Sequence, residues 1–364
     1  MKKTGLRKID HIRLAIEKPV ESETDPGFKD VRLIHVGLPE MDLNDVDMST
    51  TFLGRRLKAP LIIEPITGGV SEAAEINRNL AEAAEEAEVA IGVGSQRAAL
   101  EDEDVAETYT VVREVASSVP VLANIGCPQL LSDEAEEHVK KVVDMLKADA
   151  LMIHLNPLQE AIQPEGETCF RGVLRRMAEI VKTLPVPVIV KETGSGISRE
   201  VAGSLKSIGV SIIDVAGLGG TNWAAVEHYR ALEARNLQKA RLGQSFRDWG
   251  IPTVASLLEV LSIPGIQVIA SGGVRTGIDV AKAIALGAEL AGLARPLLKP
   301  AVESGEAVKK ALMTVVEELK VSMFLTGSPN IKALKRAPLI ITGETYEWVK
   351  QRGIMLGERS GENL

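Results

Sequence analysis

The chain repeats one pattern eight times between Pro60 and Pro296: a short apolar run ends in a small or polar residue, and a segment of helical period follows. The eight runs are PLIIEPITGG, AIGVGS, PVLANIG, ALMIHLN, PVIVKETG, SIIDVAG, QVIASGG and LAGLARP. Nearly continuous apolar strands that alternate with helices are typical of parallel sheets buried on both faces. Eight such units predict an α/β fold, the TIM (β/α)8 barrel of roughly 250 residues, whose reactive groups lie at the carboxyl ends of the strands.

Extensions flank the predicted barrel of residues 60–320 on both sides. In residues 1–59, a helical pattern over 9–17 precedes two strand-like runs, 31–36 and 48–52, which we expect to form a hairpin-like plug at the amino-terminal end of the barrel. Residues 321–364 form a C-terminal extension with a helical pattern over 344–350. The long loop 218–250 keeps two of the three tryptophans, and its length predicts an ordered platform or lid of the active site.

Composition excludes several classes of partner. With 42 basic and 50 acidic residues the net charge is -8, so we expect no nucleic acid or membrane partner. The two cysteines, Cys127 and Cys169, are too few for a disulfide framework and belong to no zinc-binding cluster. No apolar run resembles a signal peptide or a membrane span, and we therefore predict a cytoplasmic protein.

The seventh and eighth units carry a phosphate-site signal. They end in ASGGVRTG and GLARP, so that small residues precede a helix start, where free backbone N–H groups and the helix dipole favour an anion. Loops after these two strands form the usual phosphate site of this barrel. The alternative is that Gly272 and Gly273 only make a tight turn. The predicted phosphate site consists of Gly272, Gly273, Val274, Arg275, Ala294 and Arg295.

Other strand ends carry polar residues. Lys191 ends the fifth strand, and a lysine in a barrel mouth is desolvated unless it meets an anion or an electron-rich ring. It could form a Schiff base, or it could stabilise the anionic reduced form of a flavin. Thr67, Ser95 and Asn124 end three other strands and could bind the polar edge of such a ring, although each alone is explained equally well by a capped turn.

The loop after the fourth strand, IHLNPLQEAIQ, contains His154 and Glu160. A carboxylate among neutral polar groups suits a hard divalent cation that meets a substrate diphosphate, whereas zinc would require more His or Cys. The alternative is a solvated glutamate. Further cationic donors for a multiply charged ligand are Arg7, Lys8, His11 and Arg97.

Taken in order, these segments resemble the type 2 isopentenyl-diphosphate isomerases, flavin-dependent enzymes that interconvert isopentenyl and dimethylallyl diphosphates. The resemblance covers essentially the whole chain. The segments that carry it are RKIDHI, ITGG, GSQR, ANIG, HLNPLQE, KETGSGIS, GLGGTNW, WGIPT and SGGVRTG. The first loop departs from the family pattern, because Ile66 stands where methionine is expected before Thr67.

The resemblance implies that FMN lies across the barrel mouth, with its phosphate on the glycine loops. Further FMN contacts would be Pro65, Ile66, Thr67, Gly68, Ser95, Asn124, Lys191 and Thr221. The resemblance assigns the substrate diphosphate to Arg7, Lys8, His11, Ser95, Gln96, Arg97, Asn156 and Gln159. It also implies that Glu160 holds Mg²⁺ and that His154 and Gln159 support the reduced flavin.

Moving a carbon–carbon double bond requires protonation of an unactivated alkene, for which ordinary carboxylates are poorly matched in pKa. The hypothesis is that the proton passes through N5 or N1 of reduced FMN and that NAD(P)H only reduces the flavin. The expected assembly is a homotetramer or homo-octamer. Two other classes stay open: an FMN-dependent 2-hydroxy-acid oxidase or dehydrogenase, with His228 as its nearest candidate base, and a phosphate-binding scaffold without activity.

Overall fold

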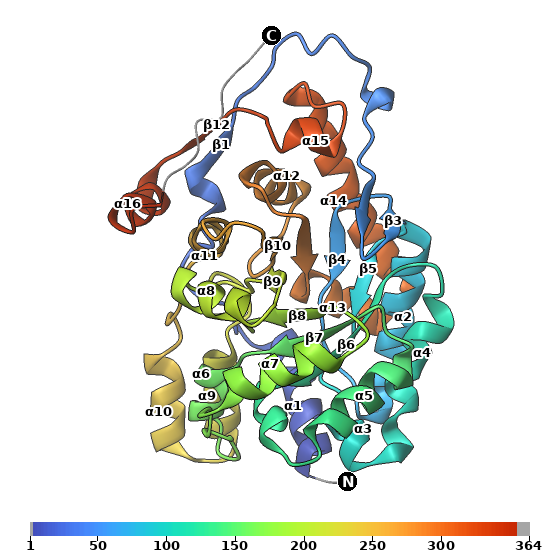
Figure 1. Ribbon diagram of the computed structural model, residues 1–364, viewed down its shortest axis with the longest axis vertical. Helices are drawn as coiled ribbons and strands as arrows, with labels where there is room; N and C mark the ends of the chain where they lie inside the picture. Colours follow the sequence, from blue (N-terminus) through green and yellow to red (C-terminus); the bar gives the residue numbers. More distant parts are fainter. Residues whose placement is uncertain (1–2, 355–364) are drawn as a thin grey trace.

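The computed structural model describes residues 3–354 and contains a closed barrel of eight parallel strands (Figure 1). The ring closes where β11 pairs with β4, so that Ala291 lies opposite Leu61. The eight predicted strands are all present, and the predicted TIM barrel is confirmed. The strands are β4 (Leu61–Ile63), β5 (Ala90–Gly92), β6 (Val121–Gly126), β7 (Ala150–His154), β8 (Val188–Lys191), β9 (Ile212–Asp214), β10 (Gln267–Ala270) and β11 (Leu290–Leu293).

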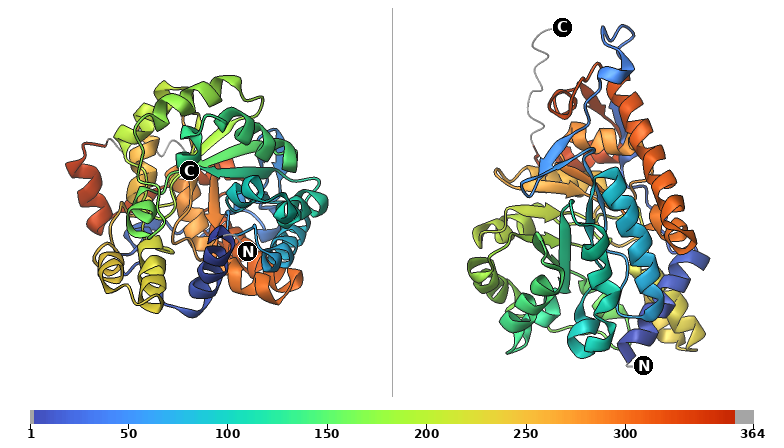
Figure 2. Two further views of the ribbon diagram at one scale, coloured as in Figure 1. Left: turned by 90° about the horizontal axis from the view of Figure 1, so that it is seen from below. Right: turned by 90° about the vertical axis from the view of Figure 1, so that its right-hand side faces the viewer.

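Helices cover the outside of the ring (Figure 2). In the helix after the first barrel strand, Ile76, Leu80 and Ala84 are buried on one face, and Val70 occupies the N-cap position without a side-chain cap hydrogen bond. The covering helices are α2 (Ser71–Ala87), α3 (Arg97–Glu101), α4 (Glu107–Val115), α5 (Ala135–Leu146), α6 (Pro157–Ile162), α7 (Val173–Thr183), α8 (Arg199–Ser207), α11 (Thr253–Leu261), α12 (Gly277–Leu286), α13 (Arg295–Glu303) and α14 (Gly305–Leu325). Short 3-10 helices are η1 (Phe28–Asp30), η2 (Leu43–Asp45), η3 (Glu103–Val105) and η4 (Cys127–Leu131).

Two small sheets lie outside the barrel, and they correct one prediction. β2 (Thr50–Phe52) forms a hairpin with β3 (Arg55–Leu57), whereas β1 (Val31–Leu33) pairs with β12 (Leu339–Ile341). The predicted hairpin between 31–36 and 48–52 is therefore wrong, because three-residue strands contain too little pattern to identify a distant partner such as Ile341, which pairs with Val31. Phe52 and Leu57 pack against the apolar side chains inside the barrel.

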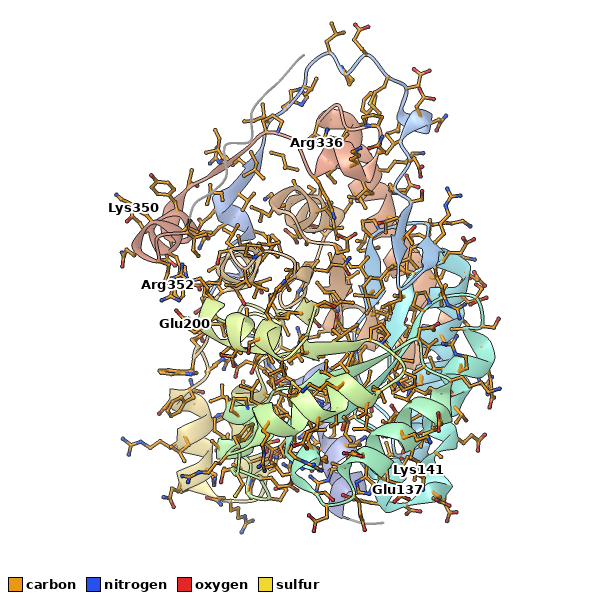
Figure 3. All side chains as sticks on the ribbon, viewed as in Figure 1. Glu137, Lys141, Glu200, Arg336, Lys350 and Arg352 are labelled. Carbon is orange, nitrogen blue, oxygen red and sulfur yellow. The ribbon has the colours of Figure 1, made fainter. Side chains whose placement is uncertain are left out.

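The C-terminal segment consists of α15 (Ile331–Leu334), β12 and α16 (Gly343–Gln351). The predicted helix over 344–350 is confirmed, but the boundary at 320 falls inside α14, so the segment begins after Leu325. Glu259 of α11 is fully buried and accepts hydrogen bonds from Trp348 Nε1 at 3.0 Å and Arg352 Nε at 2.6 Å. Figure 3 shows Arg352 directed towards Glu200 of α8. Residues 355–364 of the predicted extension lie outside the described residues.

The carboxyl end of the barrel is covered by α1 (Lys3–Glu17), which lies in Figure 1 at the end opposite to β1 and β12. The segment 218–250 is largely helical: α9 (Trp223–Glu233) and α10 (Leu237–Ser245) pack against each other, and α9 also contacts α1 and α6. It is ordered, as expected, but it is a helical pair and not a loop. None of the helices within residues 3–354 is long and apolar enough to cross a membrane.

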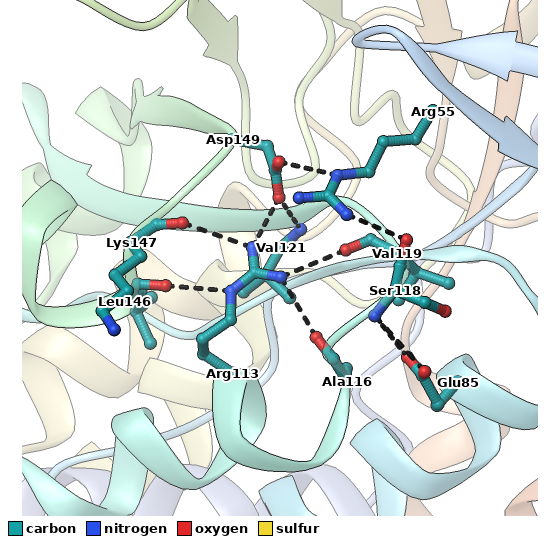
Figure 4. A network of polar contacts seen from close by, with 10 residues as sticks. All are labelled: Arg55, Glu85, Arg113, Ala116, Ser118, Val119, Val121, Leu146, Lys147 and Asp149. Atoms are coloured by element: carbon teal, nitrogen blue, oxygen red, sulfur yellow. Dashed lines mark hydrogen bonds and ion pairs between the residues drawn. The ribbon is translucent and has the colours of Figure 1, made fainter.

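At the amino-terminal end of the strands, Asp149 joins three segments (Figure 4). Its carboxylate accepts hydrogen bonds from Arg55 Nε at 2.8 Å, from the backbone N–H of Val121 at 2.9 Å and from Arg113. Arg113 also donates to the carbonyl oxygens of Leu146, Ala116 and Val119. The network ties the β2–β3 hairpin and α4 to the starts of β6 and β7.

We expect Asp149→Asn to lower the free energy of unfolding by about 2 kcal/mol, because hydrogen bonds to a charged group are lost. Burial opposes ionisation, but the Val121 N–H and Arg113 together hold the pKa of Asp149 below its usual 3.8. A depressed pKa adds stability above the unfolded value, and that contribution disappears as pH falls through the folded value. Urea unfolding should therefore show the difference from wild type at pH 7 and its decline below about pH 4.

Glu103→Gln is the matched control, since Glu103 pairs with Lys141 on the exposed surface. Such surface pairs contribute little to stability, so we expect no measurable change. An Asp149→Asn protein as stable as the control would contradict the role of the network.

Candidate active site at the barrel mouth

One pocket opens at the carboxyl end of the barrel, with a cavity volume of about 250 Å³. The structure brings most of the predicted site residues to this pocket. They are Arg7, Lys8, His11, Pro65, Ile66, Thr67, Ser95, Arg97, Asn124, His154, Asn156, Gln159, Glu160, Lys191, Thr221, Gly272, Gly273, Val274, Arg275, Ala294 and Arg295.

Two predicted contact residues, Gln96 and Gly68, do not line the pocket. The Gln96 side chain is fully buried, donates to the Val142 carbonyl at 3.0 Å and accepts the Asn124 N–H at 2.9 Å, so it holds β6 against α5. Gly68 has φ +153°, and a Cβ there would lie 2.1 Å from the ring of Tyr109. The absence of a side chain at Gly68 therefore allows the loop to pass close to the Tyr109 ring.

The predicted phosphate site lies at one end of the pocket. Gly272 and Gly273 have positive φ, and a Cβ on Gly272 would lie 2.2 Å from the Gly217 carbonyl oxygen. Within residues 3–354, the N–H groups of Gly272, Gly273 and Val274 donate no backbone hydrogen bond, which leaves them available to an anion. These features fit the phosphate of FMN.

Arg275 and Arg295 are held together at this end by Glu21, a residue that the sequence analysis missed. Arg275 Nη2 and Arg295 Nη1 each contact one oxygen of its carboxylate, the latter at 3.0 Å. Burial opposes ionisation, but the two guanidinium groups hold the pKa of Glu21 below its usual range. The carboxylate therefore fixes two cations side by side.

Lys191 lies on the barrel side of the pocket and is only 7% exposed. Its Nζ donates to the Glu192 carbonyl at 2.7 Å and lies 3.6 Å from Glu64 and 3.5 Å from Asp214. Burial alone would lower the pKa of Lys191, but Asp214 and Glu64 outweigh it and raise the pKa. The group is an ammonium ion, which disfavours the Schiff base and favours the flavin-edge role.

His154 ends β7 and contacts Asn124 through Nδ1···Oδ1 at 2.9 Å. Asn124 donates its Nδ2 to the Val93 carbonyl, and this orients the amide so that Oδ1 faces the imidazole. The proton therefore resides on Nδ1 and leaves Nε2 as an acceptor. Burial, with smaller contributions from Lys191, Lys8 and Arg7, lowers the pKa of His154 to about 3, so the ring is neutral.

Glu160 is buried at the start of α6 and is held by donors on both oxygens. Asn156 Nδ2 donates to Oε1 at 2.8 Å, while Gln163 Nε2 and the Glu167 N–H donate to Oε2 at 2.7 and 2.6 Å. This leaves the buried oxygens Asn156 Oδ1 and Gln163 Oε1 without a hydrogen-bond partner among the described residues. The candidate metal ligands are all oxygen atoms. They fit Mg²⁺, which proteins bind through one or two carboxylates together with the phosphates of the substrate.

The described residues contain no group of three or more His, Cys, Asp or Glu side chains placed to hold a metal.

Helix α1 supplies the cations on the other side of the pocket. Arg7 lines the pocket and has no ion pair within residues 3–354. Lys8 Nζ donates to the Ser95 carbonyl at 2.8 Å and the Tyr109 hydroxyl at 2.6 Å, and burial and Arg7 lower its pKa to about 7. His11 contacts the buried Glu227 at 2.8 Å. An approaching diphosphate would favour the charged form of Lys8.

Arg97 lines the same side of the pocket but pairs with two acids. Its Nε contacts Glu101 at 2.7 Å and its Nη2 contacts Glu167 at 2.6 Å. Because the Glu167 N–H also donates to Glu160, Glu167 connects Arg97 to the candidate Mg²⁺ ligand.

Five residues that the sequence analysis did not identify support these groups. Glu64 and Asp214 could have been identified, since each is an acid at the end of an apolar strand. The other three lie in segments whose sequence pattern does not indicate a role at the pocket. The five are Glu21, Glu64, Tyr109, Asp214 and Glu227.

The comparisons with known proteins agree with this geometry. The model of the family described as FMN-dependent dehydrogenase matches residues 21–148 and 173–341. Among solved structures, a mandelate oxidase with a monooxide FMN adduct has a TM-score of 0.62 at 18% identity, covering 90% of this chain and 98% of that chain. A mandelate oxidase with benzoyl-formic acid has 0.61 at 19%, covering 92% and 94%. The fold and the phosphate end of the pocket thus define an FMN-dependent barrel enzyme.

Closer relatives specify the family. The isopentenyl-diphosphate delta-isomerase of Methanosarcina mazei is 49% identical over 98% of this chain and 97% of the relative. Those of Methanothrix thermoacetophila and Pyrococcus furiosus are 51% and 47% identical over 96% of this chain, and over 97% and 90% of the relatives. The chain belongs to the isopentenyl-diphosphate delta-isomerase family, in its FMN-dependent type 2 form.

The oxidase alternative loses its candidate base. His228 lies in α9 and contacts the Ala240 carbonyl at 2.7 Å, and it is not among the described residues that line the pocket. The likeness to the two mandelate oxidase structures, at 18% and 19% identity, shows the fold alone.

We expect His154 to stay neutral from pH 8 down to about pH 4, with its proton on Nδ1. Nitrogen NMR of the imidazole distinguishes the two tautomers and the cation. In Asn124→Asp the adjacent carboxylate should favour the cation and raise the pKa of His154. A titration of His154 near its usual 6.5 in the unmodified protein would contradict the geometry.

Proposed function

We propose that the protein interconverts isopentenyl and dimethylallyl diphosphates with FMN bound across the barrel mouth. The observation that carries the proposal is a single pocket with two anion-binding ends. Glycine loops with Arg275 and Arg295 form one end, and the cations of α1 with the Glu160 oxygen cluster form the other. An isomerase that uses a flavin and a diphosphate substrate needs both. The relatives near 50% identity bear the name of this activity.

The diphosphate is assigned to the α1 side of the pocket. Arg7 is free to bind it, and Lys8 already points into the pocket beside the Ser95 carbonyl. Charge-assisted hydrogen bonds from such groups are among the stronger polar contacts in proteins. The remaining proposed contacts are His11, Ser95, Arg97, Asn156 and Gln159.

Mg²⁺ is assigned to Glu160, with Asn156 and Gln163 supplying neutral oxygens. The ion would bridge to the diphosphate, since this cluster provides only one carboxylate. Gln163 extends the predicted site, which contained Glu160 alone.

Reduced FMN, when bound, supplies the acid and base for proton transfer to and from carbon, and NAD(P)H serves to reduce it. The side chains around the ring position would bind and orient it. Thr67, Asn124 and Thr221 present neutral groups, and Lys191 presents a positive charge. His154 is neutral and offers Nε2 as an acceptor. His154 and Gln159 are thus proposed to orient the reactants and not to titrate.

A cytoplasmic location and a homotetramer or homo-octamer remain part of the proposal. Both cysteines are free, which suits a reducing compartment. Exposed apolar side chains on α14, among them Met313, Val321 and Leu325, offer a surface for association. Light scattering of the purified protein tests the assembly.

The direct test is an anaerobic assay with isopentenyl diphosphate, reduced FMN and Mg²⁺. We expect dimethylallyl diphosphate to form without net oxidation of the flavin. Product formation with lactate or mandelate as reductant, together with bleaching of oxidised FMN, would instead support an oxidase. A protein that neither binds FMN nor forms product would overturn the proposal.

We expect Arg7→Ala to raise the Michaelis constant about tenfold to a hundredfold, because a charge-assisted contact contributes roughly 1.5–3 kcal/mol. The turnover number should change much less, since the contact is made in both ground and transition states. Arg13→Ala is the control on the same helix, because Arg13 pairs with Glu233 outside the pocket. Equal Michaelis constants in the two variants would contradict the assignment.

We expect Glu160→Gln to lose Mg²⁺-dependent activity, because an amide is a poorer ligand for a hard cation than a carboxylate. Calorimetry with Mg²⁺ and isopentenyl diphosphate should show binding in wild type and little in the variant. Glu165→Gln serves as the control from the same segment, since Glu165 pairs with Arg230. Retention of the metal response in Glu160→Gln would remove Glu160 from the site.

A further inference from the structure

At the pocket, the side chain of Lys191 lies beside two buried acids. Its Nζ lies 3.6 Å from Oε2 of Glu64, which follows β4, and 3.5 Å from Oδ2 of Asp214, which ends β9. Glu64 is 4% exposed and Asp214 is fully buried. Glu64 also lines the pocket. The cluster therefore combines two carboxyl groups and one ammonium with almost no access to water.

The hydrogen bonds of this cluster are incomplete. Asp214 Oδ1 accepts the Ser271 hydroxyl at 2.6 Å and the Ala216 N–H at 3.2 Å. Asp214 Oδ2 and both oxygens of Glu64 have no hydrogen-bond partner among the described residues. Buried acceptors without donors are strongly unfavourable. A proton on Glu64, directed at Asp214 Oδ2, provides the missing donor.

The charges of the cluster also favour a proton on Glu64. Two carboxylates beside one ammonium have a net charge of minus one in a dry site, and like-charged acids this close retain a proton between them. Burial and the adjacent Asp214 raise the pKa of Glu64 well above its usual 4.5, and Lys191 only partly opposes them. With one proton shared, the cluster is neutral.

Other titratable groups face the cluster. Glu192 follows Lys191, accepts N–H groups of Thr193 at 2.6 Å and Gly194 at 2.7 Å, and has its pKa raised to about 7, mainly by burial. His154, on the adjacent strand β7, also feels the charge of Lys191. Glu192 is held by its own backbone cap, so its titration can be separated from that of Glu64 by substitution.

We propose that Glu64 is a positioning residue for the flavin: by sharing one proton with Asp214 it fixes the charge that Lys191 presents to the ring, and thereby the reduction potential of bound FMN. The inference rests on the proposed FMN site. Close packing holds the carboxyl group in place, because a Cβ on Gly292 would lie 2.2 Å from Glu64 Oε1. Loss of the shared proton places a net negative charge beside the ring and disfavours its anionic reduced form.

The shared proton can be tested without FMN. Because Glu192 is itself partly protonated near pH 7, the test uses the flavin-free Glu192→Gln protein. Its infrared spectrum at neutral pH should show the carbonyl stretch of a protonated carboxylic acid, and this band should be lost when Glu64→Gln is added. Absence of the band from Glu192→Gln, or its survival in the double variant, overturns the proposal.

The effect on the flavin is tested by spectroelectrochemical titration of bound FMN at a series of pH values. In wild type the potential should fall by an additional step where Glu64 loses its proton. Glu64→Gln should match the wild-type potential below that step and lack the step itself, because the amide donates to Asp214 as the acid does. In Asp214→Asn the neighbouring acid that favours the proton on Glu64 is gone, so the step should move to lower pH.

Superimposable pH profiles of wild type and Glu64→Gln would refute the role in setting the potential. Failure of the unmodified protein to bind FMN would instead refute the proposed function, while the infrared result would still decide whether the proton is shared. Thermal unfolding of Glu64→Gln close to wild type shows that the changes are local.

Discussion

Closure of the eight parallel strands is the constraint on which the site depends. The strands are apolar on both faces, since one set of side chains fills the barrel and the other packs under the helices. Polar groups are therefore confined to the strand ends. Because all strands run parallel, their carboxyl ends meet at one mouth, and residues as distant as Thr67 and Ser271 reach the same pocket.

This constraint explains which features the sequence made predictable. The alternation of apolar runs and helical segments specified the barrel, and the glycines and polar residues at strand ends specified the pocket. Contacts between distant segments were not predictable: Glu21 reaches Arg275, and Tyr109 reaches Lys8, from elements whose own patterns show no such role. The position of the Gln96 side chain was not predictable either, because its neighbours line the pocket while this side chain turns into the interface with α5.

The pocket concentrates positive charge in a protein whose net charge is -8. It does so by supporting each cation with a buried partner: Glu21 joins two arginines at the phosphate end, and Asp214 stabilises Lys191 in the barrel. Arg7 is the exception, as it lines the pocket without an ion pair inside the described residues. Partnered cations hold a resident cofactor in fixed geometry, whereas a free cation gains most from a ligand that comes and goes.

The titratable side chains around this pocket are engaged by neighbouring groups. Lys8, whose pKa is lowered to about 7, donates to the Ser95 carbonyl and the Tyr109 hydroxyl. His154 is neutral because burial lowers its pKa, and its Nδ1 is committed to Asn124. Glu160 is surrounded by donors on both oxygens, and Glu192 is capped by backbone N–H groups. An oxidase of this fold would need a histidine base facing its substrate, and His228 is turned away into α10. These contacts suit a pocket that binds and orients two anions, as a flavin-dependent isomerase with a diphosphate substrate requires.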